Sequence, residues 1–151
     1  MNMKRMIAVV AASLVAATII EAQSTPIQEF KDAKLQIQQG DKHKEIDSVL
    51  RYEPEALIIR PDDKKQAEAG RTLKYSDVTS AEYTFGKSPR VTAALLVSPM
   101  FLFNSSKSHW LTVKTADDYA LLRLDKSNYK LVIAELEKRT HITVASIGEN
   151  K

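Results

Sequence analysis

The feature that most constrains the fold of this chain is the order of its sequence patterns. Short alternating segments come first, and one amphipathic helix follows near the C-terminus. Within "SNYKLVIAELEKRT", apolar residues recur at the spacing of one helix face, namely at Tyr129, Val132, Ile133 and Leu136. Asp125 or Ser127 is expected to cap the start of this helix, because either side chain can accept free backbone N–H groups. Lys138 and Arg139 fall in the last turn, where the helix dipole favours positive charge.

The segments before the helix alternate apolar and polar residues, as strands with one buried face do. In "EIDSVLRYE", one face carries Ile46, Ser48, Leu50 and Tyr52. The clearest hairpin runs from "HWLTVKT" through a turn at 116–118 to "YALLRLD". About seven short strands followed by one helix predict a mainly β domain, an antiparallel two-sheet sandwich or open barrel that the C-terminal helix caps.

Three stretches, "LKYSDVTSAEY", "HWLTVKTADDYALLRLDK" and "NYKLVIAELEKRT", resemble bacterial domains of the pleckstrin-homology-like (PH-like) and GRAM-like type. The resemblance covers roughly Ile46–Thr140, most of the chain after the expected signal peptide, and rests on structural rather than catalytic patterns. It implies two orthogonal sheets closed by a C-terminal helix. Members bind phosphoinositides, peptides or other proteins, but "YEPEAL" is acidic where phosphoinositide binders carry basic residues. The resemblance therefore implies the fold and no particular ligand.

The N-terminus has the three regions of a secretory signal peptide: basic Lys4 and Arg5, the apolar run Met6–Ile20, and small Ala22 in a polar cleavage region. The apolar run is shorter than the ~20 residues that a spanning helix needs. An uncleaved N-terminal anchor is the alternative. We expect a signal peptide over 1–22, a linker over 23–33, the PH-like domain over 34–146 and a tail over 147–151.

The chain has no cysteine, which excludes disulfides, thiolate metal sites and a cysteine nucleophile. Together with the signal-like N-terminus, this favours a bacterial periplasmic or secreted protein that its core alone holds together. The formal charge is +3, from 22 basic and 19 acidic residues. Removal of Lys4, Arg5 and Glu21 leaves 20 basic and 18 acidic residues, a charge near +2. Nucleic-acid binding is not expected, because it needs a concentrated basic surface.

One stretch, Val91–Phe103, has no charge at all, and it lies between Arg90 and Lys107. As a helix its thirteen residues cover about 20 Å, whereas the hydrocarbon core of a bilayer is roughly 30 Å thick. The stretch predicts either core strands or a short buried helix, or else a surface that contacts a membrane or a partner. The candidate contact residues are Arg90, Leu95, Leu96, Met100, Phe101, Phe103, Lys107 and Trp110.

Other conspicuous residues have ordinary structural explanations. Trp110 is expected to cover a sheet face rather than to stack on a ligand, and His109 to be a surface histidine rather than a pH sensor. No metal or cofactor is expected, because the histidines are scattered, at His43, His109 and His141. The sequence contains neither GxSxG nor HExxH, and no pattern brings Glu53, Glu55 and Asp77 together for acid–base chemistry.

Three functions remain, and we do not expect an enzyme. The first hypothesis is a non-enzymatic exported binding module that acts at an envelope surface or on a protein partner. It predicts an accessible Val91–Phe103 stretch or an unpaired sheet edge that accepts a peptide strand. The alternatives are a carrier of a small apolar ligand, with a cavity between sheet and helix lined by Phe101, Phe103 and Tyr129, and a small hydrolase.

Overall fold

The computed structural model describes residues 25–40, 42–87, 89 and 106–147 of the chain. The expected signal peptide (1–22), the uncharged stretch Val91–Phe103 and all but the first residue of the expected tail lie outside the described residues.

Strands of the described residues form a single sheet in the order β4-β3-β2-β1-β7-β6-β5-β8. In chain order they are β1 (Gln28–Gln39), β2 (Lys42–Tyr52), β3 (Ala56–Pro61), β4 (Arg71–Lys74), β5 (Val78–Gly86), β6 (Ser108–Thr115), β7 (Tyr119–Leu124) and β8 (Ala145–Ser146). Neighbouring strands are antiparallel except β5 and β8, which are parallel. Two short 3₁₀ helices, η1 (Lys64–Ala69) and η2 (Tyr75–Asp77), and one α-helix, α1 (Tyr129–Thr140), complete the described part.

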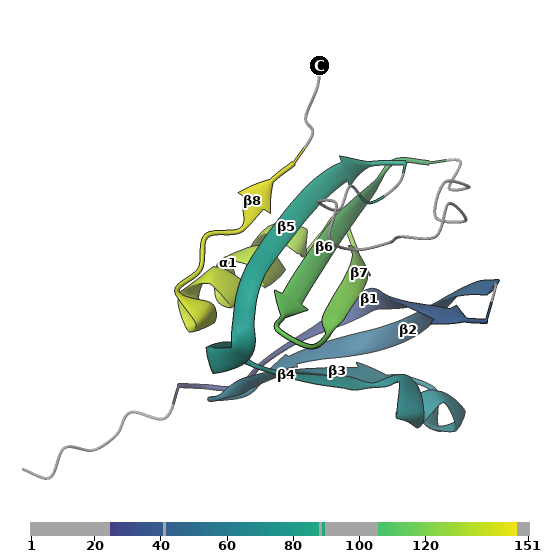
Figure 1. The fold of residues 1–151 in the computed structure, drawn as a ribbon, viewed down its shortest axis with the longest axis horizontal. Coiled ribbons are helices and arrows are strands. Elements are labelled where there is room, and N and C mark those ends of the chain that lie inside the picture. Colours follow the sequence, from purple (N-terminus) through teal and green to yellow (C-terminus); the bar gives the residue numbers. More distant parts are fainter. Residues whose placement is uncertain (1–24, 41, 88, 90–105, 148–151) are drawn as a thin grey trace, which may run out of the picture.

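The sheet is open and sharply bent, so that its two halves form the layers of a sandwich. Figure 1 shows β1–β4 running across the direction of β5–β7, with α1 beside the second half. The halves are joined where β1 pairs with β7, through Lys34–Arg123, Leu35–Leu122 and Gln36–Leu121. This arrangement confirms the expected fold class, a mainly β sandwich capped by a C-terminal helix.

The core lies between the two halves and is built by alternating residues, as the sequence pattern predicts. On β2 the buried face includes Ile46, Ser48, Leu50 and Tyr52. Across the sandwich, Leu111 and Val113 of β6 and Leu122 of β7 are fully buried. Val132 and Leu136 of α1 close this core, while Tyr129 and Ile133 pack against its margin, which confirms the predicted helix stripe.

Strand β6 departs from simple alternation because both of its faces are buried. Trp110 and Thr112 lie opposite Leu111 and Val113 on the strand, yet they are only 3% and 2% exposed. The indole N–H of Trp110 donates to the carbonyl of Gly86, at 3.0 Å. Trp110 therefore covers the second sheet face, and its burial does not support a contact role for its ring.

The start of α1 differs from the expectation. Asp125 accepts the backbone N–H of Ser127 at 2.8 Å, but this bond closes the turn before the helix rather than capping it. The N-cap residue is Asn128, whose side chain makes no capping bond. Its amide instead donates to the carbonyl of Lys31 at 2.9 Å, so it fastens the helix start to β1. Lys138 and Arg139 lie in the last turn, as predicted.

Strand β1 begins at Gln28, inside the segment expected to be a linker. Phe30 pairs with Leu50 in the ladder, and its ring packs edge-on against Tyr52, with centroids 5.8 Å apart. A bulge between Phe30 and Ala33 interrupts the alternation, and its residue Asp32 has a positive φ of 63°. The broken period hides the start of this strand, whereas its second half, "KLQIQ", keeps the alternation at Leu35 and Ile37 that predicts a strand.

A buried cation, Arg139, ties three distant segments together at the end of α1. Its side chain is 3% exposed and lies 2.6 Å from the carboxylate of Glu135, one helical turn earlier. Its guanidinium also donates to the carbonyl of Glu53 at 2.8 Å, in the β2–β3 turn, and to that of Pro26 at 2.6 Å, before β1. Its planar fork of donors suits such a site.

We predict that Arg139→Met lowers the free energy of unfolding by about 3–5 kcal/mol, because it leaves the buried Glu135 carboxylate with only the longer contact to the exposed Lys138 ammonium group, at 3.7 Å. Urea unfolding followed by circular dichroism measures the change. The control is Lys138→Met, at a neighbouring side chain that is 61% exposed, and its effect should stay within about 0.5 kcal/mol. Equal effects of the two substitutions would contradict the assigned role of Arg139.

Candidate functional site

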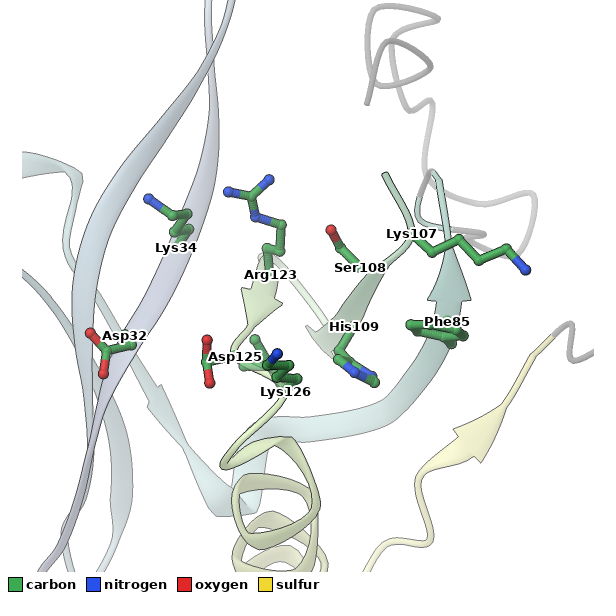
Figure 2. Close-up of a pocket in the computed structure, with 10 residues that line it drawn as sticks. Asp32, Lys34, Phe85, Lys107, Ser108, His109, Arg123, Asp125 and Lys126 are labelled. Carbon is green, nitrogen blue, oxygen red and sulfur yellow. The ribbon is translucent and has the colours of Figure 1, made fainter. Parts of the chain in front are cut away.

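A pocket of about 380 Å³ lies where β1 and β7 part and the chain turns toward α1 (Figure 2). Its walls are Asp32 and Lys34 from β1, Phe85 from β5, Lys107–His109 at the start of β6, and Arg123–Lys126 at the end of β7. Because the ladder between β1 and β7 stops at the pair Lys34–Arg123, the strands separate beyond it and leave this space.

One wall of the pocket belongs to an aromatic stack that joins β5, β6 and α1; its members are Tyr83, Phe85, His109 and Tyr129. The His109 ring lies nearly parallel to that of Tyr129, with centroids 3.8 Å apart, and 4.7 Å from that of Phe85. The hydroxyl of Tyr83 lies 2.8 Å from Nδ1 of His109. Tyr129 is the first residue of α1, so the stack fixes the helix start against the sheet.

His109 is therefore not an ordinary surface histidine. Burial in the stack lowers the pKa of its imidazole below the usual 6.5, and the nearby Asp125 carboxylate opposes this shift. The neutral ring is favoured at neutral pH, and the Nδ1 atom stays bonded to Tyr83.

A row of charged side chains forms the upper wall in Figure 2. Lys34 forms an ion pair with Asp47 of β2, and Arg123 of β7 reaches Glu45 of β2 at 2.9 Å. These contacts tie β2, β1 and β7 together. They also hold the Lys34 and Arg123 side chains at the pocket.

Two carboxylates lie at the opposite wall. Asp32 is the residue of the β1 bulge with positive φ, a conformation that aspartate tolerates better than most residues. Asp125 follows β7, and its Oδ1 accepts both the backbone N–H and the hydroxyl of Ser127, at 2.8 and 2.5 Å. These bonds, led by the one from the hydroxyl, lower the pKa of Asp125, so it stays ionised at neutral pH.

The second candidate feature is the outer edge of β5. Its inner side pairs with β6 along the strand, whereas on its outer side the pairs made by described residues are those of Glu82 and Tyr83 with β8. The N–H of Ile147 adds a bond of 2.8 Å to the carbonyl of Tyr83. Both β8 residues are exposed, and β8 covers part of this edge with a strand of the chain itself.

The predicted contact residues separate into three groups. Most lie outside the described residues: Arg90, Leu95, Leu96, Met100, Phe101 and Phe103. Trp110 is buried in the sheet. Lys107 lines the pocket, with its ammonium group 5.9 Å above the ring of Phe85.

Sequence patterns missed most of the pocket. Lys34 and Arg123 are far apart in the sequence and meet only through the pairing of β1 with β7. Phe85 falls in the alternating pattern of a strand, which predicts a core residue, yet it is 37% exposed. Its position next to Gly86, the last residue of β5, was the sequence signal that could have indicated exposure.

The described residues also bear on the other hypotheses. They contain no group of three side chains that could together hold a metal ion. Tyr129, expected to line an apolar cavity, instead packs against His109, while Phe101 and Phe103 lie outside the described residues. None of the helices described is long and apolar enough to cross a membrane.

No protein-family model and no curated protein matches this sequence. The fold is similar to a solved structure of the Spt16D Pob3N heterodimer, at 12% identity and a TM-score of 0.51, over 85% of this chain and 61% of that chain. It is also similar to the C-terminal domain of an unknown protein from Leishmania infantum, at 16% identity and a TM-score of 0.42, over 75% and 85% of the two chains. Identities this low show the fold alone, a mainly β sandwich with one C-terminal helix.

We predict that the protein loses stability as pH falls from about 7.5 to 5.5, because the unfolded chain takes up a proton on His109 before the folded one does. The contribution of His109 to the free energy of unfolding is fully present above 6.5, the usual pKa of histidine. It is lost as pH falls through the lower pKa of the folded state. His109→Phe keeps a stacked ring and removes the titration. Its free energy of unfolding should therefore change less over this range.

The control for this measurement is His141→Asn. His141 is the C-cap residue of α1 and has a left-handed backbone conformation, which asparagine tolerates. His43 contributes with the same sign, because burial lowers its pKa as well, so His109→Phe should remove only part of the slope. An unchanged slope in His109→Phe would contradict the prediction.

Proposed function

We propose that this chain is a non-enzymatic binding module that holds a protein partner by adding a strand to the outer edge of β5. The single observation that carries the proposal is the parallel pairing of β5 with β8 from the chain's own C-terminal segment. Main-chain hydrogen bonds along a sheet edge supply affinity for an extended peptide, and side chains beside the edge supply specificity.

The outer edge of β5 is longer than the part of it that pairs with a described strand. Strand β5 spans Val78–Gly86, whereas β8 pairs with only two of its residues. The segment that leads to β8 is anchored separately, because Ile142 and Val144 pack against the core and the N–H of Val144 donates to the side chain of Glu137 at 2.8 Å. A partner strand could therefore replace β8 while this anchor stays in place.

The side chains behind the edge are firmly held. Glu82, at the centre of the pairing, is 8% exposed and lies 3.1 Å from the ammonium group of Lys114 on β6. Tyr83, the next residue, belongs to the aromatic stack. A rigid strand of this kind loses little conformational freedom when a peptide binds, which favours affinity.

Two further considerations support the proposal. The solved structure with a TM-score of 0.51 is that of a heterodimer, so the matched chain in that structure assembles with another protein. The signal-like residues 1–22 favour action outside the cytoplasm, at a bacterial envelope or in secretion. We therefore propose an exported module whose partner is a protein with an extended segment.

The test uses the full chain with Ile147→Pro, which removes the N–H that bonds Tyr83 and so weakens the hold of β8. A fluorescent peptide with the sequence of 141–151 should bind this variant measurably more tightly than the wild type in an anisotropy titration. Ile147→Ala is the matched control, because it loses the same side chain but keeps the N–H.

A second control is the same peptide with proline in place of isoleucine at 147, which should bind more weakly. If Ile147→Pro stays folded by circular dichroism and does not bind the unmodified peptide better than Ile147→Ala does, the β5 edge is not a strand-accepting site.

A further inference from the structure

We infer that the pocket between β1 and β7 binds a small aromatic zwitterion, of the chemical class of the free aromatic α-amino acids. The inference is separate from strand addition at the β5 edge, because it rests on the pocket alone. Its volume of about 380 Å³ lies within the usual range for small-molecule sites.

The aromatic wall supplies a surface for a ligand ring. Phe85 is the most exposed member of the stack, at 37%, and the His109 ring stacks against it with centroids 4.7 Å apart. Rings prefer offset-stacked or edge-on neighbours, so the part of the Phe85 ring that His109 does not cover is a suitable surface for a planar ligand. The stack is already ordered by Tyr83 and Tyr129, so the wall needs no rearrangement to accept a ring.

The cationic wall supplies partners for a carboxylate. Arg123 contacts Glu45 through Nη2, and a guanidinium has further N–H groups that can donate to a second carboxylate. Among the described residues, no carboxylate lies within ion-pair distance of Lys107 or Lys126. Figure 2 shows Arg123 beside Lys34 on the upper side of the pocket, whereas Lys107 extends past Phe85, with its ammonium group directed away from Arg123.

The acidic wall supplies partners for an ammonium group. Asp32 of β1 and Asp125 after β7 both line the pocket, beyond the last ladder pair Lys34–Arg123. Figure 2 shows both carboxylates on the side of the pocket away from Phe85 and Lys107. An ammonium group on that side of the pocket is attracted by each of the two carboxylates.

The two charged walls together select the ligand class. A simple anion would meet Asp32 and Asp125 as well as the cations, and a simple amine would meet the cations as well as the carboxylates. A zwitterion with an aromatic group has a partner at each of the three walls. Like-charge contacts disfavour simple anions and simple amines.

The test titrates the ¹⁵N-labelled full chain with L-phenylalanine and follows the amide signals of Phe85, Ser108 and Lys126 by NMR. Three comparison compounds each lack one feature: 3-phenylpropionate has no ammonium group, phenethylamine no carboxylate and L-alanine no ring. We expect saturable shifts with L-phenylalanine and a dissociation constant about tenfold lower than for each comparison compound.

Matched variants locate the binding. Asp32→Asn should weaken binding of L-phenylalanine but not of 3-phenylpropionate, and asparagine tolerates the positive φ at this position. Phe85→Leu should weaken binding of both. Asp62→Asn, at a residue that does not line the pocket, should change neither.

Two results would overturn the inference. One is the absence of saturable shifts with L-phenylalanine in the folded wild type. The other is equal affinity for L-phenylalanine and 3-phenylpropionate, since the carboxylates of Asp32 and Asp125 would then take no part in binding.

Discussion

The short ladder between β1 and β7 is the contact on which the rest of the structure depends. Three residue pairs join the two halves of the sheet there, and the core forms in the angle between those halves. The ladder also ends early, at Lys34 and Arg123, and the pocket begins where it ends. One local pairing thus accounts for both the closure of the sandwich and the opening in its wall.

Arg139 secures the same arrangement from the opposite end of α1. It bonds the β2–β3 turn and the segment before β1, whereas Asn128 and the aromatic stack hold the start of the helix. The helix is therefore fastened at both ends, by polar contacts at one end and by polar and aromatic contacts at the other. This leaves the β5 edge and the pocket as surfaces of a rigid frame.

Local patterns were enough to predict the fold class, because β2, the β6–β7 hairpin and α1 each follow a regular period. They failed at the start of β1, where the bulge at Asp32 breaks the period. They also failed at the pocket, because its walls come from four separate places in the chain and carry no shared motif. Charge alternation could not reveal that Lys34 and Arg123 would become neighbours.

The brief pairing of β8 has a mechanical consequence. Within the described residues, a pulling force on the C-terminal segment acts first on the parallel pairing of β8 with Glu82 and Tyr83 of β5. These pairs can separate without disturbing the core. The next points of resistance are the packed side chains of Ile142 and Val144, and behind them the last turn of α1 with its buried Arg139. Tension from this end would therefore expose the β5 edge well before it unfolds the sandwich.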